Sequence, residues 1–242
     1  MQKHSLSVVV TAYNEEKTIA NAVRDTDNAL LKYGGDYEII VVNDASMDKT
    51  REILDALPKN DRWRVVHNAV NHNTGYNMRL GVSMANKEYC LCFVNADTYP
   101  SEETFRELFS AIGEKDVVLG CLAGYGRDRT WMRRFLSWTF VKVMNVLFCL
   151  HIRYYNGPVI VKTSVWRTVP MTTNGFAYMA EVVATLLKRR MSYVEIPVVL
   201  SPERKGVNVA VLRRNFLNVA GTLASLFWRL NVKKELYVRE NS

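Results

Sequence analysis

The stretch YEIIVVNDASMDKT, residues 37–50, decides the fold because it joins two patterns that belong to different elements. An uninterrupted run of Ile and Val predicts a strand that is buried on both faces. Oxygen-bearing side chains follow at once, at Asn43, Asp44, Ser46 and Asp48, and a helical pattern begins after them. The stretch therefore predicts a strand–loop–helix unit of a parallel sheet, with a polar cluster at the carboxyl end of the strand.

The same alternation runs through residues 1–120. We expect strands at residues 6–13, 37–46, 63–70, 88–97 and 116–124, with helical patterns between them. Because these strands are apolar on both faces, they predict an α/β fold built on a mostly parallel sheet with helices on both faces. Polar clusters stand at the strand ends, at Tyr13–Glu15, Asn43–Asp48, Asn68–Gly75 and Asn95–Asp97. Such sheets bind ligands beyond the carboxyl ends of their strands, so one shared crevice is expected there.

Residues 121–242 break this alternation. We expect one long helix or two over residues 127–153, a short strand pair over 154–169 around Gly157–Pro158, a helix over 176–191, a strand over 192–206 that runs into a basic loop, and an amphipathic helix over 211–230. On a helical wheel the polar residues Arg133, Arg134, Ser137, Lys142 and Asn145 share one half of the first segment. The last helix places Arg229 opposite an apolar stripe. No linker divides the chain, which predicts a single domain over residues 1–242.

The charge is distributed unevenly along the chain. Residues 1–120 hold 13 Lys and Arg against 18 Asp and Glu, a net −5, whereas residues 121–242 hold 19 against 6, a net +13. A basic half suits phosphates, nucleic acid or an anionic membrane. Neither amphipathic segment reaches the roughly 20 apolar residues needed to span a bilayer. We expect both to lie in the membrane interface; the alternative is that both pack on the protein core.

Several classes of site are excluded by the motifs that are missing. The sequence has no Walker-type phosphate loop, no Gly-x-Gly-x-x-Gly after the first strand, no Gly-x-Ser-x-Gly elbow and no histidine pair with metal-ligand spacing. The cysteines, Cys90, Cys92, Cys121 and Cys149, lack zinc spacing and are interpreted as reduced core residues of a cytosolic protein. The N-terminal apolar stretch is too short for a signal peptide. What remains is a crevice of carboxylates and amides that suits a nucleotide with a divalent metal.

Four motifs in order carry a resemblance: VVVTAYNEEKTI, YEIIVVNDASMDKT, NHNTGYNMRLGVSMAN and FVNADTYPSEE. They resemble the nucleotide-sugar motifs of family 2 glycosyltransferases, which implies the GT-A fold. The later stretch YMAEVVATLLKRRMSYVEIPVVLSPERKGVN is similar to the closing segment of polyprenyl-phosphate glycosyltransferases, the dolichol-phosphate mannose synthase branch. The resemblance covers about residues 6–210. It implies a nucleotide-sugar half at 1–120 and an acceptor and membrane-interface half at 121–242.

The resemblance implies roles for residues at the crevice. On the donor side these are Ala12, Tyr13, Asn14, Glu15, Asn43, Asp44, Asn73, Gly75 and Arg79. Asp97, with the neutral Asn95, stands at the family's Asp-x-Asp position and would hold Mg²⁺ or Mn²⁺. The family has Asp where this chain has Asn43 and Asn95, and Tyr99 replaces a metal-binding Gln of the mannose synthase branch. A metal held by one carboxylate is expected to bind more weakly than one held by two.

On the acceptor side the resemblance implies Arg133, Arg134 and Ser137, at the start of an interface helix; the alternative is that the arginines only snorkel. Glu181 stands where the branch has an active-site Glu. A lone Glu in an apolar helix is costly unless it is paired. Arg204 or Lys205 is the expected partner, and both would also bind phosphate.

We therefore expect an inverting glycosyltransferase that moves a sugar from a UDP- or GDP-linked donor to a polyprenyl phosphate. It would be cytoplasmic and peripheral, on an anionic membrane surface at the cytosolic face. One alternative is a family 2 enzyme acting on a polysaccharide or glycolipid, and another is a non-catalytic nucleotide-sugar-binding homologue. The basic half allows nucleic-acid binding, but no nucleic-acid module is visible and none is expected.

Overall fold

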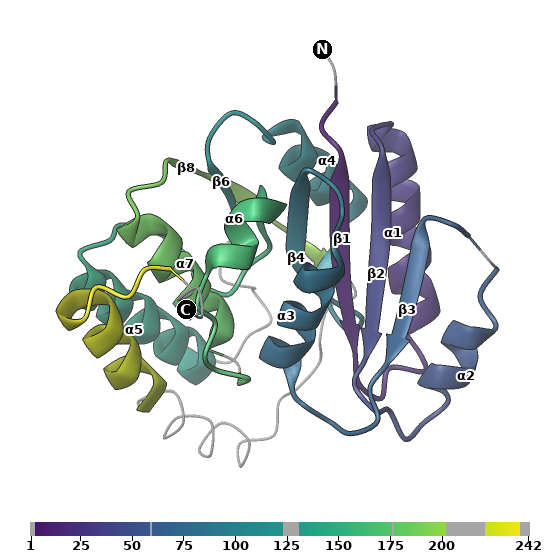
Figure 1. Ribbon diagram of the computed structural model, residues 1–242, viewed down its shortest axis with the longest axis horizontal. Coiled ribbons are helices and arrows are strands. Elements are labelled where there is room, and N and C mark those ends of the chain that lie inside the picture. Colours follow the sequence, from purple (N-terminus) through teal and green to yellow (C-terminus); the bar gives the residue numbers. More distant parts are fainter. Residues whose placement is uncertain (1–2, 59, 123–130, 176, 202–220, 238–242) are drawn as a thin grey trace, which may run out of the picture.

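The computed structural model describes residues 3–58, 60–122, 131–175, 177–201 and 221–237 (Figure 1). A seven-stranded sheet forms its centre, in the order β3-β2-β1-β4-β7-β6-β8. The strands are β1 (Leu6–Ala12), β2 (Tyr37–Asn43), β3 (Trp63–His67), β4 (Tyr89–Asn95), β6 (Val117–Leu122), β7 (Val159–Lys162) and β8 (Tyr193–Val198). All neighbours are parallel except β7, which is antiparallel to β4 and β6. The expected mostly parallel sheet is confirmed, and it takes strands from both halves of the chain.

Helices cover both faces of the sheet (Figure 1). They are α1 (Ile19–Tyr33), α2 (Thr50–Asp55), α3 (Thr74–Met84), α4 (Glu102–Ser110), α5 (Trp131–Phe148), α6 (Thr163–Thr168), α7 (Tyr178–Lys188) and a helical segment over residues 221–232. Alternate residues of each strand enter different cores. Val8 and Ile39 pack with α1 and α4, whereas Val9 and Ile40 pack with α3 and α7. Burial on both faces explains why these strands are continuously apolar.

Two helix boundaries follow the expected local signals. Ser101 caps α4, since its hydroxyl accepts a hydrogen bond from the Thr104 amide at 3.4 Å. Gly34 ends α1 in the left-handed conformation, at φ 70°. At its other end α1 begins at Ile19, and the acidic residues Glu15 and Glu16 belong to the loop before it.

The strand pair expected over residues 154–169 is wrong. Gly157 and Pro158 precede a single strand, β7, which leads directly into α6. A side chain at Gly157 would place its Cβ 1.8 Å from the Gly120 carbonyl oxygen. The glycine is therefore needed for the chain to pass β6 closely, rather than to turn a hairpin. A short strand β5 (Tyr99–Pro100) instead pairs antiparallel with β9 (Leu200–Ser201).

Helix α5 packs on the core through one side and exposes large apolar residues on the other. Val141, Met144 and Phe148 are buried. The most exposed apolar residues of the helix are Trp131, Phe135, Trp138 and Val146. Asn145, which the wheel groups with the other polar residues, is half-buried, and its side-chain amide bonds the backbone of Ile152 and the hydroxyl of Tyr155. Core packing thus accounts for only part of the apolar surface of α5.

The C-terminal helix differs from a regular wheel. Its last turn, Trp228–Val232, is a π-helix, with the Lys233 amide bonded to the Trp228 carbonyl at 2.9 Å. Leu226 and Leu230 are buried in the protein core, which is the alternative to the expected placement in the membrane interface. The Arg229 side chain is also only 11% exposed. A π turn changes the angular spacing of side chains, which a wheel with 3.6 residues per turn does not anticipate.

Two further expectations concern cysteines and membrane spans. Cys90, Cys92 and Cys121 are free and buried, but Cys149 is exposed, so its placement in the core is wrong. Within the described ranges, none of the helices has the length and apolar character required to cross a membrane.

Candidate active site

The loops after β1 and β2 are bonded to each other at the carboxyl edge of the sheet. The Asn14 amide donates to the Ser46 hydroxyl at 2.9 Å, and the Asn14 side-chain oxygen accepts from the Met47 amide at 2.8 Å. Asn14 takes the left-handed conformation that Asn tolerates, at φ 56°. Ala12 is buried, whereas Tyr13 is 44% exposed. The Tyr13 ring is thus displayed at the edge where a nucleotide base is expected.

Glu15 serves this same junction. Its amide donates to the Thr50 hydroxyl at 2.7 Å, and its carboxylate accepts from the Thr18 hydroxyl at 2.8 Å. The next amide, that of Glu16, donates to the Asp48 carboxylate at 3.0 Å. The backbone amides of Glu15 and Glu16 therefore hold the loop after β1 against the loop after β2, just before α1 begins.

Asp48 gives this junction a pH dependence. Burial opposes ionisation, but hydrogen bonds from the Thr50 hydroxyl and amide and from the Glu16 amide outweigh it, so the pKa of Asp48 lies below its ordinary 3.8. Because the folded pKa is depressed, the stabilisation by the Asp48 carboxylate is complete above the unfolded pKa and is lost as pH falls through the folded pKa.

Asp48→Asn is expected to make stability less sensitive to acid. The free energy of unfolding, measured by urea denaturation, should fall less steeply below roughly pH 4 in this variant than in the unaltered chain, because Asn cannot be protonated there. The control is the exposed Asp61→Asn; equal acid dependence in both variants would contradict the prediction.

Asn43 and Asp44 lie at the end of β2, and both are buried. The Asn43 side chain bonds the His67 ring at 2.9 Å and accepts from the Ser46 hydroxyl at 2.5 Å. Asp44 accepts bonds through both carboxylate oxygens. The donors are the Asn68 side chain and the backbone amides of His72 and Asn73, each at 2.9 Å.

The resemblance implies that Asn43 and Asp44 both contact the nucleotide, and that role stays a prediction. The carboxylate of Asp44 is engaged with the chain around residues 68–73, and it holds that chain beside β2. The amide of Asn43 likewise supports the Asn14–Ser46 junction through its bond to Ser46. Both residues thus contribute to holding this edge of the sheet in place.

Helix α3 begins next to this edge and is held from a second side. Asn73 is exposed and precedes the helix at φ 68°. The Gly75 amide donates to the Asn174 carbonyl at 3.0 Å. Arg79 donates to the Met171 carbonyl at 3.2 Å and to the Asn174 side chain. Residues 171–174, which precede α7, therefore form a wall against the start of α3. Gly75 and Arg79 are brought together here, as contacts to this wall.

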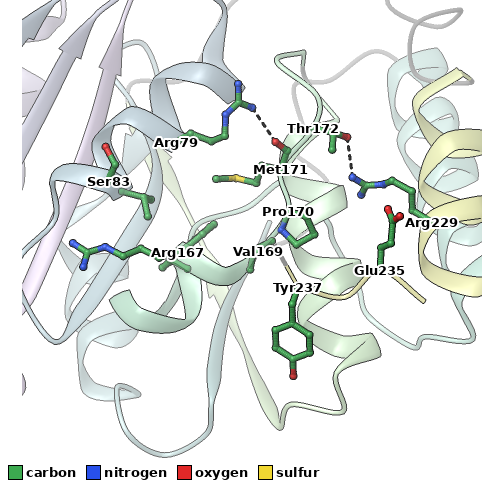
Figure 2. A pocket seen from close by; sticks show the side chains of 12 residues that line it. Arg79, Ser83, Arg167, Val169, Pro170, Met171, Thr172, Arg229, Glu235 and Tyr237 are labelled. Carbon is green, nitrogen blue, oxygen red and sulfur yellow. Dashed lines mark hydrogen bonds between the residues drawn. The ribbon is translucent and has the colours of Figure 1, made fainter. Parts of the chain in front are cut away.

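A cavity of about 470 Å³ lies behind that wall, between α3, the residues after α6 and the C-terminal segment (Figure 2). Three of its lining residues are Arg79, Arg167 and Arg229. Each donates to the protein itself: to the wall, to the Ala85 carbonyl at 2.6 Å and to Glu181, respectively. The cations of this cavity thus stabilise the surrounding segments.

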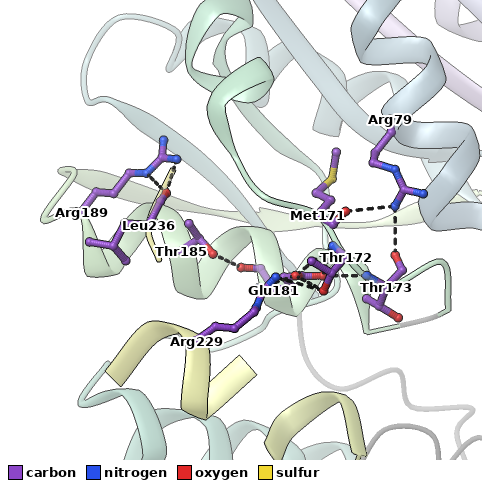
Figure 3. Close-up of polar contacts among 9 residues, drawn as sticks. All are labelled: Arg79, Met171, Thr172, Thr173, Glu181, Thr185, Arg189, Arg229 and Leu236. Carbon is purple, nitrogen blue, oxygen red and sulfur yellow. Dashed lines mark hydrogen bonds and ion pairs between the residues drawn. The ribbon is translucent and has the colours of Figure 1, made fainter. Parts of the chain in front are cut away.

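Glu181 lies on α7 with its side chain 1% exposed (Figure 3). Its carboxylate accepts bonds from the Thr172 amide and hydroxyl, at 3.0 and 2.8 Å, and from the Thr173 amide at 3.1 Å. Arg229 completes the set at 2.6 Å. The expected need for a cationic partner is met, but by a residue that the wheel placed in solvent. These donors hold the carboxylate in place, and the catalytic role that the resemblance implies for Glu181 stays a prediction.

Asn95 and Asp97 stand at the end of β4. The Asn95 side-chain oxygen accepts from the Thr11 hydroxyl at 2.9 Å, and Asp97 accepts from the Thr98 hydroxyl at 3.0 Å. Their oxygen atoms are the hard donors that Mg²⁺ and Mn²⁺ prefer. In the part of the chain that the structure covers, no three His, Cys, Asp or Glu side chains gather as a metal site. The donor set fits a metal that takes its other ligands from a diphosphate and water.

The acceptor residues lie on α5 and beyond it. Arg133 is in this helix, but its side chain is outside the described part. Arg134 is exposed and Ser137 is half-buried. Arg204 and Lys205 fall outside the described residues.

The sequence analysis did not identify Arg229 or the wall at 171–174 as part of the site. The one available signal was the lone Glu181, because a buried carboxylate requires a partner.

Residues 7–169 match the model of glycosyl transferase family 2, which is more than half of the chain. The chain belongs to this family. It is similar to undecaprenyl-phosphate 4-deoxy-4-formamido-L-arabinose transferase of Pseudomonas aeruginosa, at 28% identity over 130 residues, 53% of this chain and 38% of that protein. It is also similar to glycosyltransferase GlyG of Streptococcus pneumoniae, at 33% identity over 123 residues, 50% of this chain and 40% of that protein. The part of each relative that this chain matches is thus less than half of the relative's own length.

The family 2 chain also resembles solved structures. One is glucosyl-3-phosphoglycerate synthase of Mycobacterium tuberculosis in complex with Mn²⁺, UDP-glucose and phosphoglyceric acid. The TM-score is 0.70 at 18% identity, covering 93% of this chain and 80% of that one. The expected GT-A fold and the resemblance to family 2 are confirmed.

Proposed function

We propose that this family 2 chain is an inverting glycosyltransferase whose donor is a nucleotide-sugar and whose acceptor is a polyprenyl phosphate. The observation that carries the proposal is the bonded edge after β1, β2 and β4, which displays Tyr13 and Asn14. The relatives support the acceptor, because the first of them is an undecaprenyl-phosphate transferase. A neighbour of the same fold crystallised with UDP-glucose supports the donor.

The state of Glu181 favours a phosphate acceptor over a hydroxyl. A hydroxyl acceptor needs a general base, and the carboxylate of Glu181 is saturated by Thr172, Thr173 and Arg229. A phosphate monoester has a second pKa near ~6 and is anionic at neutral pH. Its oxygen attacks the anomeric carbon as the bond to the nucleoside diphosphate breaks, so no proton must be removed. Attack opposite the leaving group inverts the anomeric configuration.

We propose the following roles for this chain's residues. Tyr13 and Asn14 orient the base and ribose, while Asp44 and Asn73 set the edge beside them. Asp97, aided by Asn95, would hold Mg²⁺ or Mn²⁺, which supplies positive charge to the departing diphosphate. A neighbour crystallised with Mg²⁺ and UDP supports that metal class. Arg133, Arg134 and Ser137, with Arg204 and Lys205, are proposed to receive the acceptor phosphate.

We further propose peripheral attachment at the cytosolic face of an anionic membrane. Trp131 is 78% exposed and Phe135 57%, on the same helix as the acceptor residues. Aromatic side chains beside cations suit the headgroup region of a bilayer.

Replacing both aromatic residues by Ser is expected to lower binding to phosphatidylglycerol vesicles by roughly tenfold or more, because burying one such side chain contributes about 1.5–3 kcal/mol. Co-sedimentation measures the change. The matched control replaces Met47 and Val70, exposed apolar residues of the first half, by Ser. Equal binding by the two double variants would contradict attachment through α5.

Nucleotide release tests the function itself. The full chain is incubated with UDP- and GDP-sugars and Mn²⁺, with and without a short polyprenyl phosphate. Release that requires the lipid establishes the transferase and its donor. Release without lipid means that the sugar passes to water by slow hydrolysis or to another acceptor that accompanies the protein, and it favours a family 2 enzyme with an acceptor such as a polysaccharide. Absence of release in every mixture rejects the proposed activity and favours a nucleotide-sugar-binding protein.

A further inference from the structure

We infer that Arg229 is a positioning residue for donor binding, which acts through Glu181 and residues 171–174 on the start of α3. The inference rests on the proposed function, because the start of α3 is the segment proposed to lie beside the donor. A path of hydrogen bonds joins the C-terminal helix to this edge of the sheet, and Figure 3 shows its part from Arg229 to Arg79 on α3. Each link of the path is a contact between described residues.

The first link is the ion pair of Arg229 with Glu181. One guanidinium nitrogen donates to the Glu181 carboxylate at 2.6 Å, and another donates to the Thr172 hydroxyl at 3.0 Å. The side chains are 11% and 1% exposed. A charge-assisted bond with so little exposure to water is strong, and loss of one partner leaves the other charge buried.

The second link is the carboxylate of Glu181 with the wall. Its two oxygens accept from the backbone amides of Thr172 and Thr173, at 3.0 to 3.1 Å. The position of the Thr172 and Thr173 amides therefore depends on the position of the Glu181 carboxylate. Arg229 bonds to the same oxygen as the Thr172 hydroxyl, so the guanidinium and the wall share one anchor.

The third link is the wall with α3. The Asn174 carbonyl accepts from the Gly75 amide at 3.0 Å, and Arg79 donates to the Met171 and Thr173 carbonyls at 3.2 and 3.5 Å. On its other side the start of α3 is bonded to Asp44 through the Asn73 amide. A shift of the wall must therefore move the segment between the wall and Asp44.

The C-terminal helix thus has a role beyond filling the core. The same turn that places Arg229 inside exposes Trp228, at 55%. A shift of this helix would displace Arg229, and the hydrogen bonds through Glu181 and residues 171–174 would transmit the shift to the start of α3. Loosening the path is expected to weaken donor binding more than acceptor binding.

The test compares Arg229→Met with Arg189→Met. Arg189 also holds the C-terminal segment, through the Leu236 carbonyl at 2.8 Å and the Tyr237 ring at 4.0 Å. It bonds Thr168, which precedes the wall, but no residue of 171–174. Hydrogen exchange of peptides spanning 171–175 and 72–79 is measured in the full chain, with UDP and GDP affinity in Mn²⁺. We expect Arg229→Met to speed exchange in both peptides about tenfold and to weaken nucleotide binding similarly.

Arg189→Met is expected to leave both peptides and nucleotide affinity unchanged. Arg229→Lys keeps the charge but loses the second donor of the fork, so it should be intermediate, and it keeps the test usable if Arg229→Met folds poorly. In the transferase assay the donor KM should rise while the acceptor KM does not.

The inference is overturned if Arg229→Met changes exchange only within residues 221–237, or if Arg189→Met has the same effect on the wall. Failure of the unaltered chain to bind any nucleotide rejects the proposed function and the role in donor binding. The exchange result is independent of that failure, because it reports the path itself.

Discussion

Asp97→Ala is expected to lower lipid-dependent nucleotide release by about 10²–10³-fold, the loss typical of removing one group that stabilises developing charge. Asp97 is the only carboxylate of the Asn95–Asp97 turn, so no second acid replaces it. The melting temperature, measured alongside, separates loss of the fold from loss of release, since Asp97 is half-buried and accepts a hydrogen bond from Thr98. Release as a function of Mn²⁺ concentration measures the effect.

Two variants sharpen this prediction. Asp61→Ala removes an exposed carboxylate far along the sequence from the turn and should leave release unchanged. Asn95→Asp adds the second carboxylate and should lower the Mn²⁺ concentration needed for half-maximal release several-fold, since affinity rises with ligand charge. Release by Asp97→Ala within threefold of the unaltered chain would show that Asp97 does not support the leaving group.

Gly75→Ala is expected to lower the free energy of unfolding by about 1–3 kcal/mol, the usual cost of forcing extra volume into a packed contact. The new Cβ would lie 2.4 Å from the Thr173 carbonyl oxygen and 2.9 Å from the Asn174 Cα. Both atoms are backbone, so no side chain can rotate away. The start of α3 must then separate from the wall, and nucleotide binding should weaken as well. Urea denaturation and nucleotide titration measure the two effects.

Gly221→Ala is the matched control, because among the residues that the structure describes a Cβ there meets no atom within 4 Å. Gly221 is helical, so the change should stabilise the protein by roughly 0.5–1 kcal/mol. If Gly75→Ala were as stable as the unaltered chain, the close contact between α3 and residues 171–174 would be refuted.

Much of the fold could be predicted because it depends on local periodicity. Continuous apolar runs such as Ile39–Val42 can be buried only within a sheet that is covered on both faces, so the mostly parallel architecture followed. The polar clusters could be placed at one edge because parallel strands end together. β7 could not be assigned, because its direction depends on how Gly157 passes Gly120, a contact 37 residues apart in the chain.

The sequence by itself determined the sheet, the edge that carries Tyr13, Asn14 and Asp97, and the demand of a buried Glu181 for a cation. Only the tertiary structure decided which of these groups form hydrogen bonds and ion pairs with one another. Asp44 is bonded to the backbone of another loop, and Glu181 to Arg229, 48 residues along the chain. Hydrogen-bonding capacity is a property of residue type, whereas the partner is chosen by distance and burial, which exist only after the chain has folded.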